Sequence, residues 1–285
     1  MLSHRATSVA SGASQGALFT DAQVRDLDTV LREAYDAALY VNSALEQVEY
    51  LGPMRSPAQR AYHHTGETHS RIGATGENWA SALAIESGSR VSHKPIRQAV
   101  TEWLTAAGLA SDIDIQWASD SHYEVRLKHP LSGEYENIAD VGQGNSQVLP
   151  VLVAGLRLGS GYAYVVEEPE IHLHPKAQAE LGSFFKSLYD SGVQCLVETH
   201  SEYMLLRLQQ HVASGAIPAN DIAVYYVHAS ESGKEVIPVA LDDEARFADV
   251  IPGGFFPEGL KEAKALARIR AAAEITGAQD NANRD

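Results

Sequence analysis

The sequence contains little cysteine and no long apolar run. Its one cysteine, Cys195, lies inside an apolar segment, so the chain cannot form an internal disulfide. The absence of disulfides is typical of proteins from reducing compartments. No apolar run approaches the roughly 18 residues that a membrane helix needs, and the first residues lack the apolar segment of a signal peptide. These absences predict a cytoplasmic protein with no membrane partner.

Positive charge is scarce as well. The chain has 22 lysines and arginines against 37 acidic residues, which gives a net charge of −15 at pH 7. This excess of acid argues against a broad phosphate-binding surface, although it is compatible with a local basic patch. With 285 residues, 45% of them hydrophobic, the chain can bury a large core in one domain or in one domain with a subdomain.

A β-α-β unit is the most informative part of the chain. Residues 163–166 form a short apolar run that meets the acidic stretch 167–170, where Pro169 cannot donate to a sheet. A second apolar run, 194–197, follows an amphipathic helix expected over 176–189. Because such crossovers are right-handed and join parallel strands, we predict that the two strands are parallel neighbours. Ligands bind at the carboxyl ends of such strands.

Side chains suited to chemistry follow both strands directly. Glu167 and Glu168 come after the first strand, and Glu198 and His200 after the second. We therefore predict that Glu168 and His200 lie at one edge of the sheet and face a common cleft. The plain alternative is that the adjacent glutamates are solvated loop acids.

The remaining pattern divides the chain into four parts. These are a disordered leader at 1–19, a lobe of helices and antiparallel strands at 20–137, a core at 138–241 and a tail at 242–285. A turn is expected at 52–55, and Arg55 is its last residue. Further helices are expected at 20–46, 77–86, 94–107, 148–158, 201–212 and 257–273. Further strands are expected at 48–51, 113–117, 122–128, 222–228 and 236–241.

Three motifs then occur in a specific order. The first motif is a glycine-rich segment, 140–147, that precedes an apolar helix. The second is the acidic stretch after the first strand, which extends from 167 to 175. The third is the segment 198–201 at the end of the second strand. The combination resembles the C-terminal part of ATP-binding-cassette-type ATPases found in SMC-like and RecF-like proteins and in overcoming-lysogenization-defect nucleases. It is most similar to prokaryotic ATPases of the AAA class. Residues 253–259 resemble the tail domain of unknown function that closes many of them.

The resemblance covers about residues 50–266 and implies a fold and cofactors. The fold would be an α/β P-loop NTPase-like, three-layer sheet, incomplete at its N-terminal side, with helical and antiparallel additions. The cofactors would be ATP and Mg²⁺. Glu167 would hold the metal, Glu168 would orient and deprotonate the attacking water, and His200 would contact the γ-phosphate.

The resemblance also implies a site shared between subunits. The helix start would face outwards and meet the γ-phosphate of a nucleotide held by another subunit. His172 and His174 would belong to a D-loop at the dimer interface. Partners would be a second copy or a P-loop-bearing ATPase, with a nuclease or a DNA-associated protein as a further partner. The residues assigned to the helix start are Gly142, Gly144, Asn145, Ser146 and Gln147.

One motif of the resembled family is missing. The sequence contains no match to GxxxxGK[ST], whose amides and lysine bind phosphates. We expect the isolated chain to hydrolyse ATP weakly or not at all, as a fragment or as a subunit whose partner supplies the P-loop. Two alternatives stay open: a non-catalytic regulatory subunit that donates its glycine-rich helix in trans, and a metal-dependent hydrolase built on His172 and His174 with nearby glutamates. The glycine-rich segment could also simply turn the chain into a buried helix.

Overall fold

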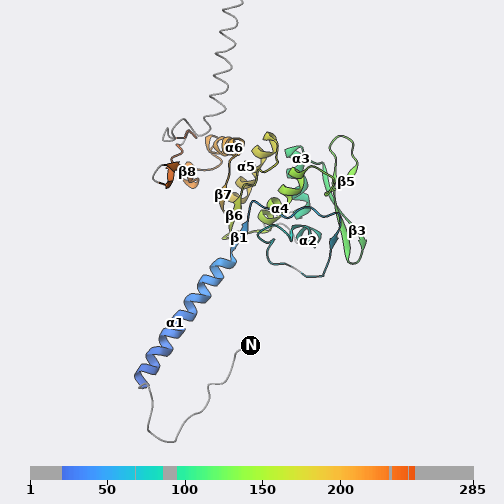
Figure 1. Ribbon diagram of the computed structural model, residues 1–285. Coiled ribbons are helices and arrows are strands. Elements are labelled where there is room, and N and C mark those ends of the chain that lie inside the picture. Colours follow the sequence, from blue (N-terminus) through green and yellow to red (C-terminus); the bar gives the residue numbers. More distant parts are fainter. Residues whose placement is uncertain (1–20, 68, 86–94, 231–232, 243, 248–285) are drawn as a thin grey trace, which may run out of the picture. The chain divides into compact units, whose positions relative to one another are not determined.

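The structure is a computed structural model that describes residues 21–67, 69–85, 95–230, 233–242 and 244–247 (Figure 1). The predicted leader at 1–19, the helix at 257–273, the segment at 253–259 and nearly all of the tail lie outside these residues. The chain divides into two compact units, Met1–Val48 and Glu49–Asp285. In the first unit, helix α1 runs over Asp21–Glu46, as the sequence predicted.

A three-stranded sheet lies at the centre of the second unit. Its strands are β1 (Val48–Leu51), β6 (Ala163–Glu167) and β7 (Gln194–Glu198), in the order β1-β6-β7. β6 and β7 pair in parallel and in register, so that Ala163 opposes Gln194 and Glu167 opposes Glu198. The predicted parallel pair is therefore confirmed, and among the described residues no further strand pairs with the outer edge of β7.

Two helices cover one face of this sheet. Helix α4 (Gln143–Arg157) and helix α5 (Pro175–Asp190) pack against the alternate side chains Tyr164 and Val166 of β6, both of which are fully buried. The Tyr164 ring contacts Phe185 of α5, and its hydroxyl donates to the Val151 carbonyl of α4 at 3.0 Å. This hydrogen bond satisfies a polar atom that would otherwise be buried without a partner. The helices and the sheet form two layers of the α/β fold.

The opposite face of the same sheet is exposed in the described structure. It carries Tyr50 of β1, Val165 of β6 and Leu196 of β7, because successive side chains of a strand point to opposite faces. Tyr50 is 43% exposed and Leu196 is 66% exposed, whereas Val165 is half-buried. Parallel sheets are normally covered on both faces, so this face differs from the usual arrangement.

The second unit also contains an antiparallel sheet of four strands. Strand β4 (His122–Lys128) pairs with β2 (Tyr62–His63), β3 (Asp112–Ser119) and β5 (Tyr135–Asn137). Helices α2 (Trp79–Ala84) and α3 (Ile96–Ala107) begin two residues later than predicted. Pro95 is the residue that precedes α3, where a missing backbone donor costs nothing.

The chain continues after β7 into helix α6 and a hairpin. Ser201 caps α6 (Glu202–Ala213) as predicted, because its hydroxyl accepts from the Met204 amide. A short 3₁₀ helix (Ala219–Asp221) leads to the antiparallel pair β8 (Val224–Ser230) and β9 (Gly233–Val239). Among the described residues, no helix has the length and apolar character needed to cross a bilayer.

Candidate functional site

The carboxyl ends of β6 and β7 bring three polar side chains together. Ligand atoms of Glu168, Glu198 and His200 lie within 4.8 Å of one another. The Nε2 atom of His200 is 3.4 Å from a carboxylate oxygen of Glu198. Glu168 is half-buried, and the other two side chains are exposed. The predicted meeting of Glu168 and His200 at one edge is therefore observed, and Glu198 joins them because it opposes Glu167 in the register.

The Glu168 side chain reaches this cluster through an unusual backbone conformation. Its φ angle is +43°, a region that residues other than glycine rarely occupy. The Glu168 amide donates to the Glu198 carbonyl at 2.8 Å, which continues the pairing of the two strands by one residue. Two adjacent glutamates on a regular strand would point to opposite faces. The break in regular geometry lets Glu168 turn towards the end of β7.

A buried arginine holds this strained turn. The Nη2 atom of Arg55 donates to the carbonyl of Glu167 at 2.7 Å and to that of Glu168 at 3.1 Å. Arg55 is only 6% exposed, and burial lowers the pKa of its guanidinium, while Tyr164, Glu170 and Glu168 act in the opposite direction. Its Nε and Nη1 atoms are buried without a hydrogen-bond partner among the described residues. Arg55 thus fixes the backbone that aims Glu168.

A buried glutamate, Glu170, fixes the backbone at His200. One carboxylate oxygen of Glu170 accepts from the Thr199 hydroxyl at 2.8 Å and from the His200 amide at 2.6 Å. Glu170 is 7% exposed, and its second oxygen is buried without a partner in the described structure. The loop after β6 is thereby tied to the loop after β7. The relative positions of Glu168 and His200 depend on this tie and on Arg55.

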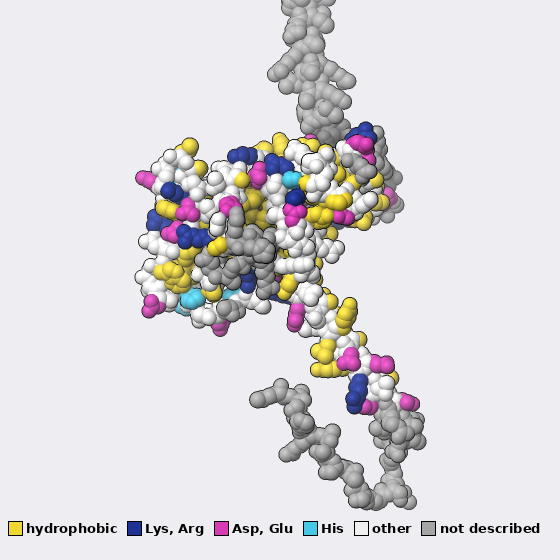
Figure 2. All heavy atoms as spheres, turned by 180° about the vertical axis from the view of Figure 1, so that it is seen from behind, with side chains coloured by type: hydrophobic (Ala, Val, Ile, Leu, Met, Phe, Trp, Pro, Cys, Tyr) yellow, Lys and Arg dark blue, Asp and Glu magenta, His cyan; other side chains and the backbone are white. Residues whose placement is uncertain are grey.

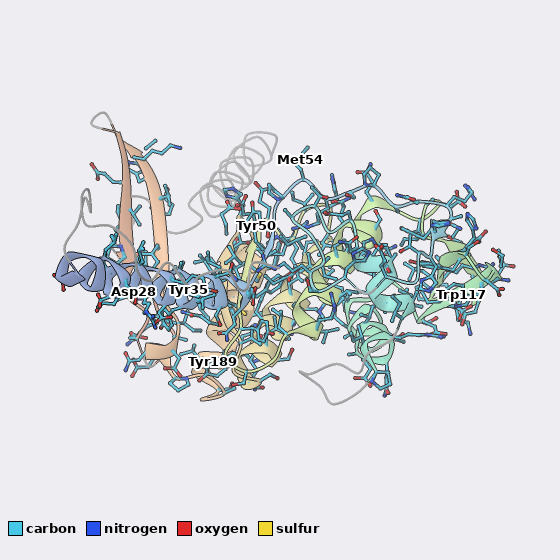
Figure 3. All side chains as sticks on the ribbon, turned by 90° about the horizontal axis from the view of Figure 1, so that it is seen from below. Asp28, Tyr35, Tyr50, Met54, Trp117 and Tyr189 are labelled. Atoms are coloured by element: carbon cyan, nitrogen blue, oxygen red, sulfur yellow. The ribbon has the colours of Figure 1, made fainter. Side chains whose placement is uncertain are left out.

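The predicted metal ligand Glu167 lies elsewhere. Its carboxylate accepts a hydrogen bond of 3.0 Å from the hydroxyl of Tyr50 on β1 (Tyr50 is labelled in Figure 3). This hydrogen bond raises the pKa of the Tyr50 hydroxyl. Among the described residues, the one group with suitable ligand geometry contains Glu168 and Glu198 and leaves Glu167 out. The physical reason is strand alternation, which directs Glu167 onto the exposed face of the sheet beside Tyr50.

The glycine-rich segment starts a helix earlier than predicted. α4 begins at Gln143, five residues before the expected start, and Gly142 precedes it. A Cβ atom at Gly144 would lie 2.6 Å from the His172 carbonyl oxygen, so glycine is required where the helix start meets the loop after β6. The segment therefore packs against its own chain.

The prediction that this helix start faces outwards is wrong for its central serine. Ser146 is 8% exposed, and its hydroxyl donates to the Gln143 carbonyl at 2.9 Å. Asn145 and Gln147 are half-buried, and only Gly142 of the predicted set is exposed. Because this hydroxyl donates its proton within its own turn, it is not available as a donor to a nucleotide in this conformation. The plainer expectation, a turn into a buried helix, fits better.

The two histidines of the predicted D-loop do not join the cluster. His174 is the cap of α5, and its Nδ1 atom accepts from the Ala177 amide at 3.3 Å. His172 is exposed and has a φ angle of +62°. Neither ring belongs to the group of described residues whose geometry could hold a cation. The structure therefore gives no support to a hydrolase centred on these two histidines.

Comparisons with known proteins place the chain in a family. The family model "AAA domain, putative AbiEii toxin, Type IV TA system" matches residues 20–206. No curated protein matches the chain. Solved structures match the chain as well, among them three at 11–14% identity.

One such structure comes from "Structural biochemistry of ATP-driven dimerization and DNA stimulated activation of SMC ATPases". It is 14% identical, with a TM-score of 0.39, over 61% of this chain and 91% of that chain. A second is an Smc head bound to the C-terminal winged-helix domain of ScpA, with 11% identity and a TM-score of 0.39 over 52% of this chain and 43% of that chain. A third, an Smc head from Pyrococcus furiosus with an extended coiled coil, is bound to the C-terminal domain of ScpA. It has 13% identity and a TM-score of 0.38 over 61% of this chain and 37% of that chain.

The family match covers more than half of the sequence and agrees with the motifs at the ends of β6 and β7. It confirms the predicted resemblance to AAA-type ATPases. The chain belongs to the AAA-domain family described as putative AbiEii toxins of type IV toxin–antitoxin systems.

Proposed function

We propose that this chain supplies the acid and histidine half of an ATP-hydrolysing site, and that a P-loop-bearing segment outside these 285 residues completes it. The observation that carries the proposal is the convergence of Glu168, Glu198 and His200 at the ends of two parallel strands. Ligands of open α/β sheets bind at such ends. Membership of an AAA family makes ATP the expected ligand.

Each residue of the cluster has a role that its chemistry allows. Glu168, held by Arg55, would accept the proton of the attacking water. His200, held by Glu170, would donate a hydrogen bond to the terminal phosphate. Glu198 and one carboxylate oxygen of Glu168 would hold the divalent cation in place of Glu167, which leaves the other oxygen of Glu168 to accept the proton.

The donor set is compatible with Mg²⁺ and also with Mn²⁺. Two carboxylates are hard oxygen ligands of the kind that Mg²⁺ prefers, whereas an imidazole also suits later divalent metals. When bound, the cation would neutralise charge on the phosphates. Glu198 would bind the cation at the end of β7, and His200 would remain free to donate a hydrogen bond to the phosphate.

The exposed face of the β1-β6-β7 sheet supports the second half of the proposal. A strand that joined the outer edge of β7, followed by a helix across Leu196 and Val165, would cover this face in the usual manner of parallel sheets. The acids at the strand ends favour an occupant that brings positive charge to that edge. A P-loop has such a charge, because it combines a lysine with the amides of a helix N-terminus. We therefore propose a strand–P-loop–helix segment as the occupant.

A complementation experiment tests this function. The full chain would be mixed with a strand–P-loop–helix segment taken from a relative in the same family, and phosphate release from ATP and Mg²⁺ would be measured. We expect hydrolysis only in the mixture, and loss of at least 100-fold in Glu168→Gln. Glu136→Gln, which changes an exposed glutamate of β5, is the matched control. Turnover by the isolated chain, or turnover that Glu168→Gln does not reduce, would refute the proposal.

The regulatory alternative is not favoured. A subunit that donated its glycine-rich helix in trans would need an outward-facing Ser146, and this hydroxyl is turned into its own helix.

A further inference from the structure

Helix α1 carries a long apolar stripe that is exposed to solvent in the described structure. Every described side chain from 26 to 46 is exposed, including Leu27, Leu31 and Tyr35, which are 51%, 59% and 65% exposed. Figure 2 shows hydrophobic side chains along this helix, and Figure 3 labels Tyr35 and Asp28 on it. A helix with such a stripe is stable when the stripe packs against another helix.

The stripe has the spacing of a coiled coil. Its members follow one another at alternating intervals of four and three residues, which places them on one seam of the helix. They are Leu27, Leu31, Ala34, Ala38, Val41 and Leu45. Most charged side chains lie away from this seam, for example Arg32, Glu33 and Asp36. The expected partner is therefore another α-helix.

The order of large and small residues along the seam is symmetric about its midpoint. About a midpoint at residue 36, Leu27 corresponds to Leu45, Leu31 to Val41, and Ala34 to Ala38. Large residues thus correspond to large ones, and small to small. If a second copy lies antiparallel, every core layer pairs residues of matching size, and the two alanine layers let the helices approach closely at the centre.

The charges select the antiparallel direction. Residues 26–36 contain four acids and one arginine, whereas residues 37–45 contain no charged side chain. Parallel pairing would bring the two acidic halves together, and antiparallel pairing separates them. It also places Asp28 next to Asn42 of the partner subunit, whose amide can donate to a carboxylate. The helix dipoles oppose each other favourably in this arrangement.

We propose that α1 is a dimerisation element that pairs antiparallel with α1 of a second copy of this chain. The six seam side chains of each helix, four of them large, would bury an interface of roughly 1,000 Å² in total, which is the lower limit for a specific interface. This pairing needs no nucleotide and does not depend on the proposed ATPase site.

The first test is the oligomeric state of the full chain without nucleotide, measured by light scattering after size exclusion. The pairing predicts a mass twice the 30.8 kDa of one chain. Leu31→Asp places two charges in the core layers and should raise the dissociation constant at least 100-fold. Ser43→Asp adds the same charge on the polar face and should leave the dimer intact. A monomeric chain at tens of micromolar, or a dimer that Leu31→Asp does not weaken, would overturn the proposal.

The second test determines the direction of pairing by disulfide cross-linking. The antiparallel seam predicts rapid cross-linking of the double variant Leu31→Cys, Val41→Cys and none of Leu31→Cys alone. A parallel pair would instead cross-link Leu31→Cys by itself, which would contradict the proposed direction. The unsubstituted chain is the control, because burial raises the pKa of its only thiol, Cys195, to about 12 and keeps it unreactive.

Discussion

The two faces of the β1-β6-β7 sheet are built from the same three strands and differ in how far their side chains are exposed to solvent. On one face, Tyr164 and Val166 are fully buried under α4 and α5. On the other, Leu196 is 66% exposed and Tyr50 is 43% exposed. The buried face provides the stability of the fold. The exposed face ends at the acids of the candidate site and is the face that we propose a P-loop-bearing segment covers.

The largest expected contrast in stability compares one residue from each face. Tyr164→Ala removes a buried ring and should lower the free energy of unfolding by about 3–5 kcal/mol. Leu196→Ala truncates an exposed side chain and should change it by less than about 0.5 kcal/mol. Urea unfolding followed by circular dichroism measures both. Equal effects of the two substitutions would show that the exposed face is covered within the chain itself.

The reaction rates of cysteine thiols at positions 195 and 196 of β7 compare the two faces of the sheet. Burial raises the pKa of the Cys195 thiol to about 12, so its reactive thiolate is almost absent near pH 8. A cysteine placed by Leu196→Cys in a Cys195→Ser background should react with a disulfide reagent at least about 100-fold faster than native Cys195. In urea, both thiols should react at similar rates. Fast reaction of Cys195 in the folded chain would contradict its packing against the core.

Arg55 lies at the end of β6 and binds the backbone of Glu167 and Glu168, which connects the sheet to the candidate site. Arg55→Met leaves the carbonyls of Glu167 and Glu168 without this donor, which should cost about 1–3 kcal/mol of stability. It should also release the strained turn and weaken Mn²⁺ binding, measured by electron paramagnetic resonance, at least tenfold. Arg60→Met, which breaks an exposed ion pair with Asp140, is the control and should change stability by less than about 1 kcal/mol. Unchanged Mn²⁺ affinity in Arg55→Met would contradict its positioning role.

The smallest expected effect concerns a buried carboxyl of β1. Burial raises the pKa of Glu49, although its carboxylate accepts from the Ile72 amide at 2.8 Å. A carboxyl with a raised pKa in the folded state loses stability as the pH rises through that pKa, because the unfolded chain ionises more readily. Glu49→Gln has no such loss. Its stability relative to the unsubstituted chain should therefore increase from about pH 4 to about pH 7, as measured by urea unfolding, and a decrease would contradict the sign of the shift.

The sequence predicted the elements whose signals are local. The apolar runs, Pro169 and the amphipathic pattern located β6, α5 and β7, and the Ser201 cap marked the start of α6. The meeting of Glu168 with His200 followed from topology alone, because parallel neighbours end at the same edge.

The parts that the sequence did not predict depend on tertiary contacts. The turn at 52–55 indicated Arg55, but nothing in the sequence showed that its guanidinium would bind the carbonyls of Glu167 and Glu168. Glu198 could have been found from the strand register, since it opposes Glu167. The early start of α4 was missed because two glycines favour a loop locally, whereas packing against His172 stabilises a helix there.

Protection of the exposed face tests the central claim most directly. A cysteine introduced by Leu196→Cys, in the Cys195→Ser background, would be labelled with and without the strand–P-loop–helix segment under the conditions of the hydrolysis assay. The proposed completion of the site predicts that labelling slows at least tenfold when the segment is present. Labelling of Ser119→Cys, an exposed position on β3, should not change. If ATP hydrolysis appears in the mixture while the cysteine at position 196 remains equally reactive, the exposed face is not where the site is completed.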